Sequence, residues 1–318
     1  MKRESKIIIG IHGLGNKPPK SILENWWKQA IRDGLKLNNF REDDFEFELV
    51  YWADILHPIP LEVTSKNSSL TTVDERYTSE IYTERKASLT FRERTIEYLE
   101  KYYNNFIVNE VLSLKYPTIT EFFIHLHLKD LKTYYSMESI PVDGTAILTK
   151  EAIINRLIKT LNRHKDKKIL LVAHSMGSLI THDAFIERSL KTKIDTYVTI
   201  GSPLGQKYVI NRYETEKKQN LTNKLIVPEN ILSKWYNLSD LQDQIALNHE
   251  LKDFYRENSG KVMIEDQLVI NNFISNGIRN PHKAFGYLRT PEFSKIVHEF
   301  LIPKKLRLFK WIKNILGL

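Results

Sequence analysis

The sequence contains no cysteine among its 318 residues. This excludes a disulfide scaffold, an all-cysteine zinc site, an iron–sulfur cluster held by thiolates and a cysteine nucleophile. No apolar run approaches the roughly 18 residues of a membrane-spanning helix. The first apolar run stops after five residues at His12, which predicts a strand rather than a secretion signal. Both features are compatible with the cytoplasm, which is the expected location.

The composition predicts a folded globular protein with little general affinity for nucleic acid. Hydrophobic residues make up 42% and charged residues 27% of the chain, and a chain of this length can bury a large core. The net charge is +8, but five basic residues and no acidic ones follow Glu299, so the rest of the chain carries only +3. The C-terminal tail is therefore the electropositive element, and we expect no nucleic-acid partner.

Short apolar runs alternate with helical patterns along most of the chain. This alternation predicts an α/β fold with a mostly parallel central sheet and helices on both of its faces. The predicted strands are Ile7–Ile11, Phe45–Trp52, Ile169–Ala173, Tyr197–Ile200 and Trp235–Leu238, and the predicted helices are Ile22–Leu37, Glu151–His164 and Met176–Leu190.

The segment 54–148 interrupts the alternation, because it contains no convincing core strand. Its helical patterns are rich in Tyr and Phe, which predicts a mostly helical insertion that acts as a lid or cap. A helical layer that only covers one sheet edge is the alternative. The predicted core then consists of residues 1–53 and 149–303, and residues 304–318 form a separate C-terminal helix.

The strongest chemical signal is K-I-L-L-V-A-H-S-M-G-S at Lys168–Ser178. A predicted strand runs into a tight turn and a helix follows, with the small residues Ala173 and Gly177 two positions before and after Ser175. This is the context of a nucleophile elbow, G-x-S-x-G, with Ala in the first Gly position. The backbone N–H of Met176 can there point at a developing oxyanion. The alternative is an ordinary strand–helix turn in which the serine caps the helix.

A second signal, I-I-I-G-I-H-G-L-G-N, ends the first predicted strand. Its two loop glycines let the backbone approach a substrate, and the N–H of Leu14 is the candidate second donor of an oxyanion hole. A dinucleotide-binding G-x-G-x-x-G would need glycine at position 18, where the sequence has Pro18, and no Walker A pattern occurs. Nucleotide binding is therefore not expected. A third motif, T-I-G-S-P-L-G at 199–205, predicts a compact bend.

Together, these motifs resemble the α/β-hydrolase superfamily, most of all its lipase-like serine esterases. Those enzymes carry H-G-x-G near the start, [GA]-H-S-x-G at the elbow and a G-S-P turn one strand later. The resemblance covers roughly residues 1–53 and 149–300. It implies an α/β-hydrolase fold and a reaction that needs neither a metal nor an organic cofactor.

The resemblance also implies a catalytic triad in the chain order Ser175, acid, histidine. His282, in N-P-H-K-A-F-G-Y-L, resembles the loop where such enzymes keep the base. Asp243 is the expected acid, because S-D-L-Q-D-Q-I-A at 239–246 resembles the stretch in which the second Asp holds the histidine. Asp240 and Asp266 stay open as alternative acids. The histidines judged less suitable lie in the two loops or in helical patterns: His12, His125, His127, His174, His249 and His298.

The expected function is hydrolysis of a carboxylic ester, with a lipid or phospholipid ester favoured. Ser175 would form an acyl-enzyme, and the N–H groups of Leu14 and Met176 would stabilise the oxyanion. The same groups can serve an amidase, a thioesterase or an acyltransferase. A non-catalytic hydrolase-like binding module is the alternative of another class, and a nucleic-acid-associated protein anchored by the tail is a weaker one.

The tail Lys304–Leu318, K-K-L-R-L-F-K-W-I-K-N-I-L-G-L, predicts a basic amphipathic helix. At about 100° per residue, its apolar residues gather on one half of the helix and most of its basic residues on the other. This pattern predicts an anchor on an anionic membrane surface and a peripheral place on the inner membrane face. A terminal helix packed on its own domain and a partner-binding or dimer helix are the alternatives.

Overall fold

The computed structural model describes residues 5–41, 44–62, 76–79, 130–142, 144–187, 190–216, 224–246, 248–275 and 278–302. Within these ranges, a central sheet of six strands has the order β10-β8-β6-β5-β1-β2, and all neighbouring strands are parallel. The predicted α/β fold class is therefore confirmed. The strands are β1 (Lys6–Ile11), β2 (Glu46–Val50), β5 (Lys168–His174), β6 (Ile194–Ile200), β8 (Ile231–Asp240) and β10 (Ile264–Val269).

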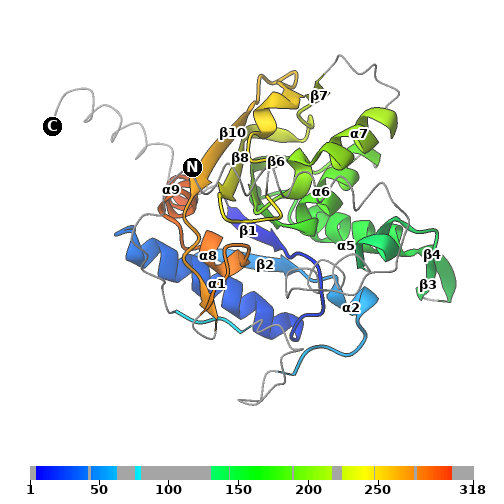
Figure 1. Ribbon diagram of the computed structural model, residues 1–318, viewed down its shortest axis with the longest axis horizontal. Coiled ribbons are helices and arrows are strands. Elements are labelled where there is room, and N and C mark those ends of the chain that lie inside the picture. The colour runs from blue at the N-terminus through cyan, green and yellow to red at the C-terminus, as the bar shows by residue number, and fades with distance from the viewer. Residues whose placement is uncertain are drawn as a thin grey trace.

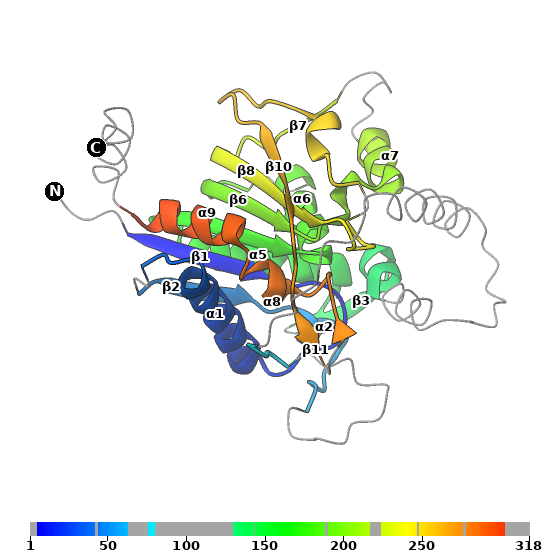
Figure 2. The same ribbon diagram turned by 60° about the vertical axis from the view of Figure 1, so that its left-hand side comes forward.

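Helices cover both faces of the sheet (Figures 1 and 2). One face carries α1 (Lys20–Leu37), α8 (Ala284–Tyr287) and α9 (Pro291–Leu301), and the other carries α5 (Thr149–Arg163) and α6 (Met176–Glu187). Successive side chains of a strand point to opposite faces of the sheet, so the strands contribute residues to two separate apolar cores. This double burial explains why the central strands are near-continuous apolar runs.

The edge strand β10 was not predicted from the sequence. Its six residues, I-E-D-Q-L-V, have three polar residues in the middle, and of the six only Ile264 and Val269 are buried. A strand at a sheet edge has one neighbour and one open side, so it need not form the apolar run by which the inner strands were found. An antiparallel hairpin of β3 (Ser139–Val142) and β4 (Thr145–Leu148), outside the central sheet, was likewise not predicted.

Smaller elements fill the connections between these strands and helices. They are α2 (Ala53–Leu56), α7 (Lys207–Glu216), β7 (Leu225–Ile226), β9 (Tyr255–Arg256), β11 (Ile274–Ser275), β12 (Ile278–Arg279) and the 3₁₀ turns Pro203–Gly205 and Leu251–Asp253. In the part of the chain that the structure describes, no helix is long and apolar enough to cross a membrane.

Two predicted units fall largely outside the described residues. Of the segment 54–148, the structure describes 54–62, 76–79, 130–142 and 144–148, and of 304–318 it describes nothing. The lid-like insertion and the amphipathic C-terminal helix therefore stay predictions.

The carboxyl ends of parallel strands meet at one edge of the sheet, and ligand sites of open α/β sheets lie there. The loop 12–19 follows β1, the turn at Ser175 follows β5, the bend at Gly201 follows β6, and the loop with Asp243 follows β8. The fold thus brings the predicted site residues to the same edge.

Candidate active site

Ser175 lies in a sharp turn between β5 and α6. Its φ of 52° falls in the left-handed region that non-glycine residues rarely adopt, so the turn is strained. The turn is tight because α6 begins against the end of β1: a Cβ on Gly177 would lie 2.7 Å from the carbonyl oxygen of Ile11. The geometry is that of the elbow predicted from A-H-S-M-G.

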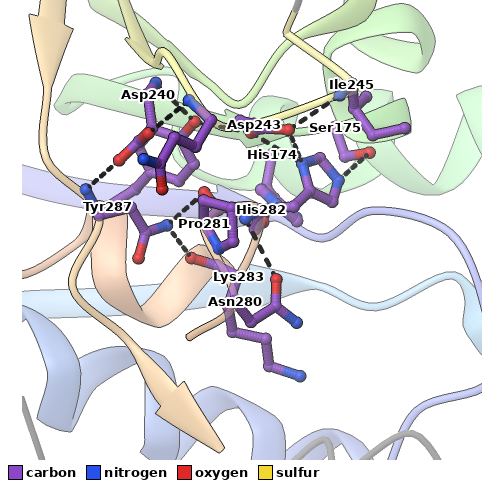
Figure 3. A network of polar contacts seen from close by, with 12 residues as sticks. His174, Ser175, Asp240, Asp243, Ile245, Asn280, Pro281, His282, Lys283 and Tyr287 are labelled. Carbon is purple, nitrogen blue, oxygen red and sulfur yellow. Dashed lines mark hydrogen bonds and ion pairs between the residues drawn. The ribbon is translucent and has the colours of Figure 1, made fainter. Parts of the chain in front are cut away.

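His282 connects Ser175 to a buried carboxylate (Figure 3). Its Nε2 lies 3.0 Å from Ser175 Oγ, and its Nδ1 lies 2.9 Å from each carboxylate oxygen of Asp243. An ionised carboxylate only accepts hydrogen bonds, so these contacts assign the proton to Nδ1. Nε2 is then free to accept the proton of the serine hydroxyl.

Asp240, the first alternative acid, has other partners. Its carboxylate accepts the backbone N–H groups of Gln242 at 2.8 Å and Asn271 at 2.5 Å, and its Oδ2 lies 2.8 Å from an Arg279 nitrogen. Burial raises the pKa of Asp240, although these donors oppose the rise. The residue therefore ties the loop after β8 to the loop after β10.

Asp266, the second alternative acid, also holds a loop. Its Oδ1 accepts the side-chain amide of Asn237 and the N–H of Leu251, both at 2.9 Å, and its Oδ2 accepts the N–H of Lys252 at 3.0 Å. Of the three acids considered, the structure brings Asp243 to His282.

Tyr287 also contacts Asp243 and was not among the predicted site residues. Its hydroxyl donates to Asp243 Oδ2 at 2.6 Å and accepts the backbone N–H of Asp240 at 2.9 Å. Burial and the nearby Asp243 charge raise the pKa of this fully buried tyrosine well above its ordinary value. It therefore stays protonated and keeps donating to the carboxylate.

We expect Tyr287→Phe to lower the free energy of unfolding by about 1–3 kcal/mol, because a buried acceptor and a buried donor lose a partner. It should also slow the labelling of Ser175 by a fluorophosphonate, because Asp243 loses one of the bonds that orient it. Urea denaturation and labelling rates measure the two effects. Tyr255→Phe is the matched control, since its buried hydroxyl contacts His182 at 2.9 Å. Equal labelling rates in both variants would contradict the expected support of Asp243.

Gly201 leaves room for the contact between Asp243 and His282. Its φ is 54°, and a Cβ at this position would lie 2.8 Å from Asp243 Oδ2 and 3.2 Å from His282 Nδ1. The G-S-P motif, a weak loop signal in the sequence, therefore packs directly against the aspartate–histidine pair.

The two predicted oxyanion donors come from elements that meet at Ser175. Met176 is the first residue of α6, and the first N–H groups of a helix have no acceptor within it. The loop of Leu14 passes close by, because a Cβ on Gly13 would lie 2.8 Å from Ser175 Cβ. Only a residue without a side chain permits this approach.

Two other histidines hold the loops of the site. The Nε2 of His12 accepts the N–H of Trp52 at 3.1 Å, so its Nδ1 donates to the carbonyl of Gly13 at 2.8 Å. His174 lies against His282, with ring centroids 4.8 Å apart, and its Nε2 is 2.7 Å from the His282 carbonyl oxygen. The contacts of His12 with Trp52 and of His174 with His282 join residues far apart in the chain, so no pattern in the sequence indicates them.

The other two described histidines considered in the sequence, His249 and His298, have contacts away from Ser175. His298 stacks on Phe40, the carbonyl of His249 accepts the side-chain amide of Asn237, and His125 and His127 lie outside the described residues. In the described ranges, no group of three or more His, Asp or Glu side chains could hold a metal ion.

A family model described as PGAP1-like alpha/beta domain matches residues 131–262, which include Ser175 and Asp243 but end before His282. No curated protein matches the chain.

Three solved structures are similar at low identity. A lipase-esterase related protein from Clostridium acetobutylicum is 11% identical over 94% of both chains, with a TM-score of 0.31. The siderophore hydrolase EstB from Aspergillus nidulans is 12% identical over 54% of this chain and 67% of its own, with a TM-score of 0.28. A putative hydrolase from Agrobacterium vitis is 16% identical over 46% and 66%, with a TM-score of 0.24.

Proposed function

We propose that the chain belongs to the α/β-hydrolase superfamily and is a serine hydrolase that cleaves a carboxylic ester through an acyl-enzyme. The observation that carries the proposal is the 3.0 Å contact between His282 Nε2 and Ser175 Oγ, made by a histidine whose Nδ1 faces Asp243. A nucleophile, a base and an orienting acid in this arrangement are the requirements of acyl transfer to serine.

In the proposed reaction, Ser175 Oγ attacks the ester carbonyl carbon while its proton passes to His282 Nε2. Asp243 stabilises the imidazolium that forms, and the N–H groups of Leu14 and Met176 donate to the oxyanion. Collapse of the tetrahedral intermediate breaks the bond to the alcohol oxygen, which takes the proton from His282. Water then attacks the acyl-enzyme and gives a proton to His282. The bond between the acyl carbon and Ser175 Oγ breaks, the serine oxygen takes the proton back from His282, and the carboxylic acid leaves.

Other acyl substrates share this tetrahedral intermediate. An amidase or a thioesterase differs in the leaving group, and an acyltransferase differs in the group that attacks the acyl-enzyme. A panel of esters, amides and thioesters with the same acyl chain, assayed with and without an alcohol acceptor, separates these activities. A hydrolase-like binding module would turn over none of them.

Covalent labelling is the direct test of the proposal. A fluorophosphonate should form an adduct on Ser175 in the folded protein, located by mass spectrometry of the digested chain, and none in urea-denatured protein. Activated esters of increasing acyl length should then be hydrolysed. A folded protein that neither reacts with the probe nor cleaves any ester in the panel would refute the proposal.

We further propose a lipid ester as the substrate and the tail Lys304–Leu318 as an anchor on an anionic membrane surface. The support is the amphipathic pattern of the tail, where each basic residue near such a surface contributes about 1 kcal/mol.

Full-length protein is therefore expected to co-sediment with anionic vesicles at low salt and to be released at high salt, because salt screens the attraction. A chain ending at Pro303 should not bind under either condition. Neutral vesicles are the control. Equal binding by the folded, shortened chain would show that the tail is not the anchor, and unfolding of the shortened chain would favour a helix packed on its own domain.

A further inference from the structure

The peptide group between Leu14 and Gly15 is held at both of its polar atoms. The carbonyl oxygen of Leu14 accepts a hydrogen bond from Lys17 Nζ at 2.5 Å, and the N–H of Gly15 donates to Asp130 Oδ2 at 2.9 Å. The Lys17 ammonium group thus contacts the oxygen of this peptide unit, and the Asp130 carboxylate contacts its N–H. Hydrogen bonds to ionised groups are roughly twice as strong as neutral ones, so both contacts restrain this peptide strongly.

Asp130 reaches this loop from the far end of the segment 54–148. It is 115 residues from Gly15 in the chain, and only 5% of it is exposed. His57, near the beginning of the same segment, places its Nε2 3.0 Å from the same oxygen, Asp130 Oδ2. Residues from both ends of the segment therefore meet at the loop of the proposed oxyanion hole.

The restrained peptide directly follows the proposed donor. Rotation of the Leu14–Gly15 peptide changes ψ of Leu14 and φ of Gly15. A loop released at this peptide can therefore shift the Cα of Leu14, and with it the preceding Gly13–Leu14 peptide that carries the Leu14 N–H. Gly15 has a φ of 85° and no side chain, so its own sterics restrict such a rotation little. The contacts with Lys17 and Asp130 then hold this peptide and the Cα of Leu14, while His12 Nδ1, 2.8 Å from the Gly13 carbonyl oxygen, holds the preceding peptide that carries the Leu14 N–H. An oxyanion hole depends on donors that are already aimed before the charge develops.

We infer that Asp130 is a positioning residue of the oxyanion hole, which acts through the Gly15 N–H to fix the Leu14 donor. The inference rests on the proposed function. Through the contact between Asp130 and Gly15, the segment 54–148 would then take part in the chemical step. If Asp130 is displaced, the contacts among Ser175, His282 and Asp243 remain, but the Leu14 N–H no longer points at the oxyanion.

The test compares Asp130→Ala and Asp130→Asn with the unaltered protein on an activated ester and its thionoester. Sulfur accepts hydrogen bonds weakly, so the ester loses more than the thionoester when an oxyanion donor is misplaced. Asp130→Ala should lower kcat by about tenfold or more, with KM changed by less than about threefold and the ester-to-thionoester rate ratio reduced. Asp130→Asn keeps a weaker, neutral acceptor and should give an intermediate ratio.

Asp54→Asn is the matched control, because Asp54 lies in the same segment and pairs with Arg156 rather than with the oxyanion loop. The Asp54→Asn variant should have the same ester-to-thionoester rate ratio as the unaltered protein. An unchanged ratio in Asp130→Ala, with or without a lower kcat, would overturn the inference. If Asp130→Ala does not fold, the ratio in Asp130→Asn decides, and a value equal to that of the unaltered protein overturns it. Absence of Ser175 labelling in the unaltered protein would instead refute the proposed function.

Discussion

Ser175→Ala is expected to abolish fluorophosphonate labelling and to lower ester turnover by about 10³-fold or more. The hydroxyl is the only group of the proposed triad that bonds to the acyl carbon, so its loss removes the covalent route. Residual turnover would come from binding and from the oxyanion donors, which remain in place.

Ser233→Ala is the matched control, because Ser233 is an exposed serine on β8. Circular dichroism and thermal unfolding establish that both variants are folded. Ser175→Ala protein that is folded and still labelled at the same rate would transfer the nucleophile role to another residue.

Asp243→Asn is expected to lower kcat/KM by roughly 10³- to 10⁴-fold, far more than Asp240→Asn or Asp266→Asn. An amide at position 243 can donate to His282 Nδ1, and this favours the tautomer with the proton on Nε2. That tautomer cannot accept the proton of Ser175. The geometry of the site would change little, so the loss would come from the protonation state alone.

Asp240→Asn and Asp266→Asn are expected to act mainly on stability. Asp240 would lose its charged contact with Arg279, and Asp266 would weaken the bonds to the loop at Leu251. Steady-state kinetics and urea denaturation of the three variants separate the two effects. A larger kinetic loss in either of these two variants than in Asp243→Asn would assign the orienting role to that residue.

The sharp turn at Ser175 and the close approach of the loop at Gly13 were predictable because each is a local feature. An apolar strand, small residues around Ser175 and a following helix lie within a few positions of one another, as do the glycines beside Leu14. Local sequence determines such turns, and the fold adds only their placement at one sheet edge. The same reasoning found the inner strands through their apolar runs, but not β10, whose edge position permits polar residues.

Asp243 was the expected acid, but the structure was needed to distinguish it from Asp240 and Asp266 by its contacts. Asp240 and Asp243 are three positions apart in one loop, and only the fold shows that Asp240 contacts Arg279 while Asp243 contacts His282. Tyr287 contacts Asp243 and Asp130 contacts Gly15, both far away in the chain, so no spacing in the sequence marks them. The central part of 54–148 and the C-terminal tail stay predictions for a different reason, since they lie outside the described residues.

The strand order has a consequence for how the chain reaches this structure. β1 pairs with β5 in a register that matches Lys6 with Lys168, so a loop of more than 150 residues must close before this central pair exists. Non-local pairings of this kind make folding slow. The entropy of closing such a loop, however, grows only with the logarithm of its length, and each doubling costs about 0.6 kcal/mol. As far as loop-closure entropy is concerned, changes in chain length between β2 and α5 thus cost the sheet little, provided that Asp130 still reaches Gly15 and Tyr134 still packs in the core.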